Sequence, residues 1–155
     1  MSYISGDMPS THFSLHYHVV FSTKERHPWI EPGWRDDLHG YLGGCVKTLR
    51  GMPVEIGGVA DHVHLLLGLR ATHRLADVVR EIKTVSSRWI HEELRVPRFG
   101  WQEGYGAFTV SRSNVPAVRH YIATQAEHHK KRRFEDEYLD LLKKHEVEFD
   151  ERFLW

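Results

Sequence analysis

The segment from Pro53 to Leu69 constrains the fold of this chain more than any other. Residues 53–59 and 62–69 are both rich in apolar side chains, and only two residues separate them. Two short apolar runs joined by so short a connection indicate a β-hairpin. Because side chains alternate across a strand, His62 and His64 share one face of the second strand, while Val63 and Leu65 share the other. The hairpin is therefore expected to turn imidazoles to one side and core aliphatics, packed on helices, to the other.

The remaining periodicities complete an α+β pattern. Residues 12–23 alternate and are rich in aromatic and β-branched types, which predicts a strand, and 105–111 predict another. Helical spacing predicts helices over 34–50 and 74–94, a third that carries Tyr121 and Gln125, and a short one from about 135 to 144. The first six elements then follow the order β-α-β-β-α-β. This order predicts a ferredoxin-like (RRM-like) split βαβ antiparallel sheet with additional C-terminal helices, and a second sheet face left open for a site.

Length and composition limit the class of protein. The 155 residues suit one domain spanning residues 1–155, with 1–10 expected to be a flexible N-terminus. Cys45 is the single cysteine, so no disulfide is expected and a reducing cytoplasm fits best. No apolar run approaches the roughly 20 residues that span a bilayer, which predicts no membrane partner.

Charge is balanced overall but uneven along the chain. The formal net charge of zero argues against nonspecific binding of polyanions. Residues 112–133 nevertheless carry six Lys or Arg against one Glu, and residues 135–151 carry eight acids against two Lys. The first stretch could bind phosphates, although charge alone favours the simpler interpretation of two solvated helix faces of opposite charge.

His62 and His64 are candidate metal ligands, because neutral imidazole is a common ligand of divalent metals. Histidine makes up 13 of the 155 residues, so about one His-x-His pair is expected by chance. A second pair, His16 and His18, occurs in the first predicted strand. The first and third strands of a ferredoxin-like sheet are neighbours, so both pairs could share one surface.

Tyr121 and Gln125 are the second candidate pair. Four residues apart, they share one face of a helix. A phenol is a poor nucleophile unless a metal polarises the phosphate that it attacks, and an amide oxygen can bind a hard metal ion without adding charge. Without the histidines, a half-buried Tyr beside a solvated Gln would be the better interpretation.

Several longer motifs, in one order, support the functional interpretation. The segments 17–24, 57–66, 101–111 and 121–125 and the ending 149–155 resemble those of the single-tyrosine transposases of the HUH superfamily, insertion-sequence 200/605 family. The resemblance runs from about residue 11 to the end. It implies a homodimer acting on single-stranded DNA with subterminal hairpins, with His62, His64 and Gln125 binding Mg²⁺ or Mn²⁺.

The same resemblance implies that Tyr121 attacks a phosphate to give a 5′-phosphotyrosine and a free 3′-OH, at an active site shared between subunits in trans. The enzyme would be cytoplasmic, and nucleoid-associated when it acts on DNA. Phe99 and Trp101 are candidates for stacking on bases, although an aromatic residue near a loop is at least as often part of the core or of an interface. Candidates for phosphate contact are the basic residues Lys24, Arg26, Lys83, Arg88, Arg112, Lys130, Lys131, Arg132 and Arg133.

Three other functions fit parts of the pattern. A domesticated relative would cut chromosomal repeat hairpins without moving its own gene. A noncatalytic RRM-like module would bind nucleic acid through exposed aromatics on the open sheet face. A zinc protein would need three or four tight ligands, which the single Cys makes harder to supply.

Overall fold

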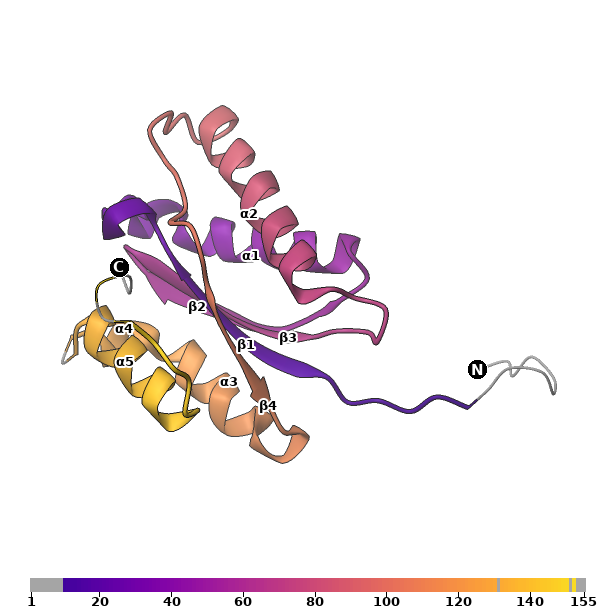
Figure 1. The fold of residues 1–155 in the computed structure, drawn as a ribbon. Helices are drawn as coiled ribbons and strands as arrows, with labels where there is room; N and C mark the ends of the chain where they lie inside the picture. Colours follow the sequence, from indigo (N-terminus) through magenta and orange to yellow (C-terminus); the bar gives the residue numbers. More distant parts are fainter. Residues whose placement is uncertain (1–9, 131, 151, 153–155) are drawn as a thin grey trace.

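The computed structural model describes residues 10–130, 132–150 and 152 (Figure 1). In chain order the elements are β1 (His16–Ser22), η1 (Lys24–Arg26), α1 (Pro32–Thr48), β2 (Met52–Val59), β3 (His62–Gly68), α2 (Leu75–Glu92), β4 (Gly106–Val110), η2 (Arg112–Asn114), α3 (Val115–Ala123), α4 (Gln125–His128) and α5 (Phe134–Lys144). The predicted order of strands and helices is confirmed, although the first strand is shorter than the predicted 12–23.

The four strands form one antiparallel sheet in the order β2-β3-β1-β4. The predicted hairpin is β2–β3, and β1 is inserted between β3 and β4, so the two βαβ units interleave. This is the predicted split βαβ arrangement with additional C-terminal helices. Among the helices of the described residues, none has both the length and the apolar character that crossing a bilayer requires.

Helices α1 and α2 cover one face of the sheet (Figure 1). Val63, Leu65 and Leu67 point to this face, as the alternation predicts, and they are fully buried. They pack with Val19 and Phe21 of β1 and with the apolar sides of the two helices, namely Leu38, Leu42, Val46, Val78, Val79, Ile82 and Ile90. This larger core fixes the strands that carry the histidines.

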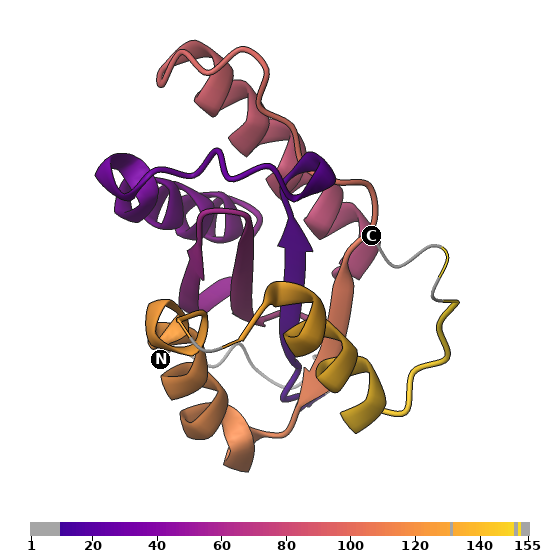
Figure 2. The ribbon, with the colours of Figure 1, turned by 90° about the vertical axis from the view of Figure 1, so that its left-hand side faces the viewer.

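The opposite face is not open, which corrects the expectation from the sequence. Helices α3, α4 and α5 lie over it, with α5 crossing in front of β1 and β4 in Figure 2. Two small apolar clusters hold these helices down. One joins Leu66 and Val110 to Val115 and Ile122 at the start and end of α3. The other joins Val20 and Phe108 to Phe134 and Leu142 of α5.

Candidate active site

The sheet register gathers the predicted histidines in the middle of the covered face. His64 lies opposite Val20 of β1 on one side and Gly57 of β2 on the other. His62 lies two residue pairs further along, opposite Ser22 of β1. Both histidine side chains are fully buried, between the apolar clusters that anchor α3 and α5. A buried polar pair needs hydrogen-bond partners, and α4 and α5 supply two of them, Gln125 and Glu137.

Gly57 lets α3 come close to these histidines. A Cβ atom at this position would lie 2.3 Å from the carbonyl oxygen of Ile122, which is closer than real Cβ contacts. The backbone of α3 therefore rests directly on β2 beside His64. Ile122 follows Tyr121 in the chain, so this close approach sets the position of the Tyr121 side chain.

Tyr121 and Gln125 both reach the histidines, but they do not lie on one unbroken helix as predicted. Helix α3 ends at Ala123 and α4 begins at Gln125, with Thr124 between them at φ −108° and ψ 25°. The Thr124 hydroxyl donates to the His120 carbonyl at 2.9 Å, a local hydrogen bond that competes with regular helix. Gln125 is still 2% exposed, and its Oε1 atom lies 3.3 Å from Nε2 of His62.

Two residues of the cluster escaped the sequence analysis, Glu137 on α5 and His129 after α4. Oε1 of Glu137 lies 2.9 Å from Nε2 of His64, and Oε2 accepts a short hydrogen bond from the Tyr121 hydroxyl. Nε2 of His129 lies 3.1 Å from Oε2 of Glu137 and 3.1 Å from Oε1 of Gln125. A sequence signal for Glu137 did exist, because an acid occupies the apolar stripe of α5.

Each strand histidine also has a partner behind it. Nδ1 of His62 donates to Oδ1 of Asp61 at 2.7 Å. Nδ1 of His64 is 2.7 Å from Nε2 of His18, the buried histidine of β1. Such contacts fix the orientation of an imidazole, so that its Nε2 atom faces the shared centre. His16 lies at the other end of β1, opposite Gly68, and does not join the cluster.

Burial and hydrogen bonds shift the pKa values of His62, His64 and Tyr121 in different directions. Burial lowers the pKa of His64 to about 4. Burial also opposes protonation of His62, but hydrogen bonds to Asp61 and Glu137 outweigh it and raise the pKa of His62 to about 9. Burial and then the contact with Glu137 raise the pKa of the Tyr121 phenol above its ordinary value. The described arrangement therefore keeps Tyr121 protonated.

The spacing of the donor atoms suits a metal ion. Nε2 of His62, Nε2 of His64, Nε2 of His129 and a carboxylate oxygen of Glu137 all lie within 4.8 Å of one another. Ligands bound at about 2.1 Å are about 3.0 Å apart at right angles and about 3.4 Å apart in a tetrahedron. Three distances between these side chains fall near these values. Nε2 of His64 lies 2.9 Å from Oε1 of Glu137. Nε2 of His62 lies 3.3 Å from Oε1 of Gln125 and 3.5 Å from Oε1 of Glu137. The donor set of imidazole, amide and carboxylate fits Mn²⁺ and also accepts Mg²⁺.

All of these side chains belong to one chain. The Tyr121 ring is 5.7 Å from the His64 ring of the same molecule, measured between ring centroids. The predicted residues therefore meet within a single chain, because the short path from β4 through α3 to α5 folds back over the histidines of the same sheet. The sharing of sites in trans between two subunits stays a prediction.

Several predicted phosphate-binding residues are engaged in ion pairs. Arg26 pairs with Glu135 at 2.7 Å, and Arg133 contacts the same carboxylate at 2.8 Å. Arg132 forms a short ion pair with Asp140. The acidic stretch at the start of α5 thus faces the basic stretch before it.

The other basic candidates are scattered. The Lys83 ammonium donates to the carbonyls of Gln102 and Gly104 at 2.8 Å and 2.5 Å, which ties α2 to the loop before β4. Lys131 lies outside the described residues. The four remaining candidates are exposed and come from separate parts of the chain, namely Lys24, Arg88, Arg112 and Lys130.

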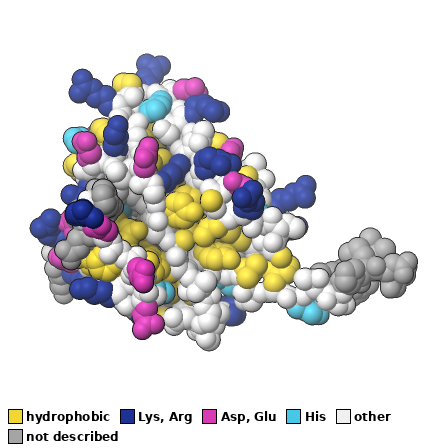
Figure 3. Space-filling view, viewed as in Figure 1, with side chains coloured by type: hydrophobic (Ala, Val, Ile, Leu, Met, Phe, Trp, Pro, Cys, Tyr) yellow, Lys and Arg dark blue, Asp and Glu magenta, His cyan; other side chains and the backbone are white. Residues whose placement is uncertain are grey.

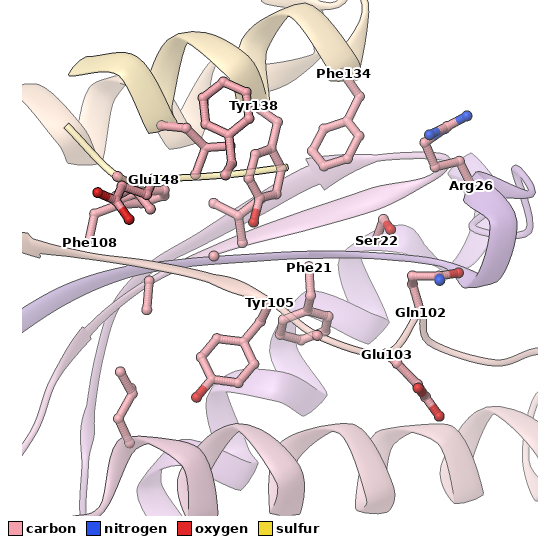
Figure 4. Close-up of a pocket in the computed structure, with 18 of the residues that line it drawn as sticks. Phe21, Ser22, Arg26, Gln102, Glu103, Tyr105, Phe108, Phe134, Tyr138 and Glu148 are labelled. Carbon is pink, nitrogen blue, oxygen red and sulfur yellow. The ribbon is translucent and has the colours of Figure 1, made fainter. Parts of the chain in front are cut away.

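A cavity of about 950 Å³ lies beside the site along β4. Figure 4 shows Phe134 and Tyr138 pointing into it from α5, with Tyr105 on the side of α2. The Phe134 ring also stacks on His62, with 4.3 Å between ring centroids, so the cavity is one ring away from the candidate ligands. In Figure 3, hydrophobic side chains are visible across the middle of this face, with Lys and Arg mostly around them.

The aromatic residues predicted to stack on bases are not at this surface. Phe99 is 3% exposed and belongs to the core between the sheet and α2. Trp101 packs edge-on against Phe21 and Phe99 and donates from Nε1 to the Ser86 hydroxyl at 3.0 Å. The prediction that these two side chains stack on bases is wrong, because the segment before β4 that carries them packs on the core.

Comparison with known proteins assigns the family. Residues 11–125 match the family model described as "Transposase IS200 like". The chain is 29% identical over 126 residues to the ISDra2 transposase TnpA of Deinococcus radiodurans, a match that covers 73% of this chain and 85% of that one.

Solved structures agree with this assignment. A crystal structure of a candidate transposase from Deinococcus radiodurans matches with a TM-score of 0.62 and 27% identity, covering 78% of this chain and 98% of that one. A REP-associated tyrosine transposase bound to a REP hairpin shares the fold, with a TM-score of 0.55 and 10% identity over 77% of this chain and 72% of that one. The resemblance seen in the sequence is confirmed, and the chain belongs to the IS200-like transposase family.

Proposed function

We propose that this chain cleaves and rejoins single-stranded DNA at hairpin-bearing transposon ends, with Tyr121 as the nucleophile. His62, His64 and Gln125 are the proposed ligands of Mg²⁺ or Mn²⁺. The observation that carries the proposal is that the Tyr121 ring lies 5.7 Å from the His64 ring, between centroids, beside the contact of His62 with Gln125, in a member of this family. The homodimer suggested by the sequence is proposed with each chain using its own Tyr121.

The chemistry assigned to the protein groups is a transesterification. The Tyr121 oxygen forms a bond to phosphorus while the bond from phosphorus to the 3′-oxygen breaks. The phenolic proton leaves Tyr121, and the departing 3′-oxygen takes up a proton to give a 3′-OH. The divalent ion supplies charge neutralisation of the phosphate when it is bound. The reverse attack by a 3′-OH restores Tyr121 and joins two strands, so no nucleotide cofactor is consumed.

Single-stranded DNA suits the shape of the molecule better than a duplex. The donor atoms are buried beneath α3 to α5, and a single strand bends toward such a recessed site more readily than a stiff duplex does. Unstacked bases next to that phosphate would meet the aromatic lining of the β4 cavity, which includes Tyr105, Phe134 and Tyr138. The covered sheet face also disfavours the RRM-like module, because that function needs the face exposed.

Covalent trapping tests the proposal. The full chain, incubated with Mg²⁺ and single-stranded DNA from the element's ends, should give an adduct on a denaturing gel. Tyr121→Phe should abolish the adduct and leave binding to the hairpin near normal. Tyr105→Phe serves as the control and should keep the adduct. Persistence of the adduct in Tyr121→Phe would move the nucleophile to another tyrosine and contradict the assignment.

A further inference from the structure

Glu137 is a buried carboxylate to which the proposed function assigns no role. It is 4% exposed and lies on the apolar side of α5, among Phe134, Tyr138 and Leu141. A carboxylate seldom occupies such a position unless something compensates its charge. Its contacts to His64 join residues 73 positions apart in the chain. Helix α5 therefore brings a negative charge into the candidate metal centre.

The two oxygens of Glu137 face different groups. Oε1 is directed at the strand histidines, 2.9 Å from Nε2 of His64 and 3.5 Å from Nε2 of His62. Oε2 accepts the hydrogen bond of the Tyr121 hydroxyl and lies 3.1 Å from Nε2 of His129. One side chain thus contacts both the candidate ligands and the candidate nucleophile.

Charge gives a reason for this placement. The proposed ligands His62, His64 and Gln125 bring no negative charge, and Asp61 reaches the centre only through the far side of the His62 ring. A divalent ion in a buried site binds more tightly when an anionic ligand offsets its charge. Among the described residues around these donor atoms, Glu137 is the acid whose oxygen lies among them.

We propose that Glu137 is a metal ligand through Oε1 and a positioning residue for Tyr121 through Oε2. The inference rests on the proposed function and deepens it, because it sets the nucleophile at a fixed place relative to the ion. Helix α5 then becomes part of the active site, in addition to covering the sheet. The competing interpretation is that Glu137 only pairs with protonated histidines and holds α5 in place.

Metal binding measured without DNA separates these interpretations. The full chain is titrated with Mn²⁺, and free Mn²⁺ is followed by electron paramagnetic resonance. Glu137→Gln keeps the size of the side chain and removes its charge. It should weaken Mn²⁺ binding by about tenfold or more. Glu135→Gln is the matched control, since Glu135 lies on the same helix and pairs with Arg26 and Arg133 instead. It should change the Kd by less than about twofold.

His64→Ala distinguishes failure of this inference from failure of the proposed function. If His64→Ala loses Mn²⁺ binding while Glu137→Gln binds as the wild type does, the metal centre stands and Glu137 is not a ligand. If neither substitution changes binding, the metal centre itself is wrong.

A measurement on the unsubstituted chain tests the ligand role without the risk that a variant misfolds. With Glu carboxyl carbons labelled with ¹³C, Mg²⁺ should shift the Glu137 resonance and leave Glu135 in place, and an unmoved Glu137 signal would reject the ligand role.

The positioning role has its own readout. At saturating Mn²⁺, Glu137→Gln should lower kcat for adduct formation by about tenfold or more while the KM for DNA stays within about threefold. Loss of helix packing alone would instead change the KM and the unfolding midpoint. An unchanged kcat at saturating Mn²⁺ would show that Tyr121 is positioned without Glu137.

Discussion

Gly57→Ala should disable the site although it adds only one methyl group. In an ordinary strand this exchange is favourable by roughly 0.5–1 kcal/mol, because Gly loses more backbone entropy on folding. At Gly57 the new Cβ would lie 2.3 Å from the Ile122 carbonyl oxygen, whereas ordinary contact begins at 3.4 Å. Helix α3 must therefore retreat by the difference, 3.4 − 2.3 = 1.1 Å.

That retreat has two measurable effects. Overpacking of this kind should lower the free energy of unfolding by about 2 kcal/mol. A displacement of about 1 Å in a nucleophile lowers the rate by on the order of 100-fold. Tyr121 precedes Ile122 directly, so the rate of adduct formation should fall by about that factor. Urea unfolding gives the first quantity, and single-turnover adduct formation on single-stranded DNA gives the second.

Gly44→Ala is the matched control. Gly44 lies within α1, and no heavy atom stands within 4 Å of the Cβ that would be added. This exchange should stabilise the helix by up to about 1 kcal/mol and leave the adduct rate unchanged. If Gly57→Ala forms the adduct within about twofold of the wild-type rate, the close approach of α3 to β2 does not set the position of Tyr121, and the reasoning fails.

Four further outcomes are expected. Mn²⁺ should bind more tightly than Mg²⁺ in calorimetry without DNA, since imidazole donors favour the softer ion; equal affinities would point to a site built from oxygen donors. His18→Leu should weaken Mn²⁺ binding by about 10–100-fold because Nδ1 of His64 loses its partner, whereas His16→Ala should not. Co-expressed Tyr121→Phe and His64→Ala chains should stay inactive as heterodimers, and recovered cleavage would favour a site shared in trans. Burial lowers the pKa of His39 to about 4, so the unfolded chain binds more protons between that pH and 6.5; the free energy of unfolding should fall as pH drops through this range, and less so in His39→Leu.

The residues of the site that lie close together in the sequence were predictable, and those brought in by the docking of α5 on the sheet were not. His62 and His64 share a face by strand alternation alone, and the two-residue connection before them indicates the hairpin. Tyr121 and Gln125 were found through their spacing, although the helix break at Thr124 was not, because a single Thr hydroxyl bond carries no periodic signal.

Glu137 and His129 were missed because their roles arise from the docking of α5. Nothing in the local sequence states that α5 will fold over the sheet face of His64, 73 residues earlier. The pattern of the first six elements predicts two helices on one face and leaves the other unassigned. The acid in the apolar stripe of α5 marked a buried carboxylate, but its partner could come only from the tertiary structure.

The order of the chain makes the site the last part of the molecule to form. Strands β1 to β4 and helices α1 and α2 end by Val110, while Tyr121, Gln125 and Glu137 all follow. A chain emerging from the ribosome can fold the sheet and its α1–α2 core before the proposed nucleophile, Tyr121, has been made. If the residues act as proposed, the site becomes complete only after α5 has been made. A chain that stops before α3 would carry the two strand histidines without the proposed nucleophile.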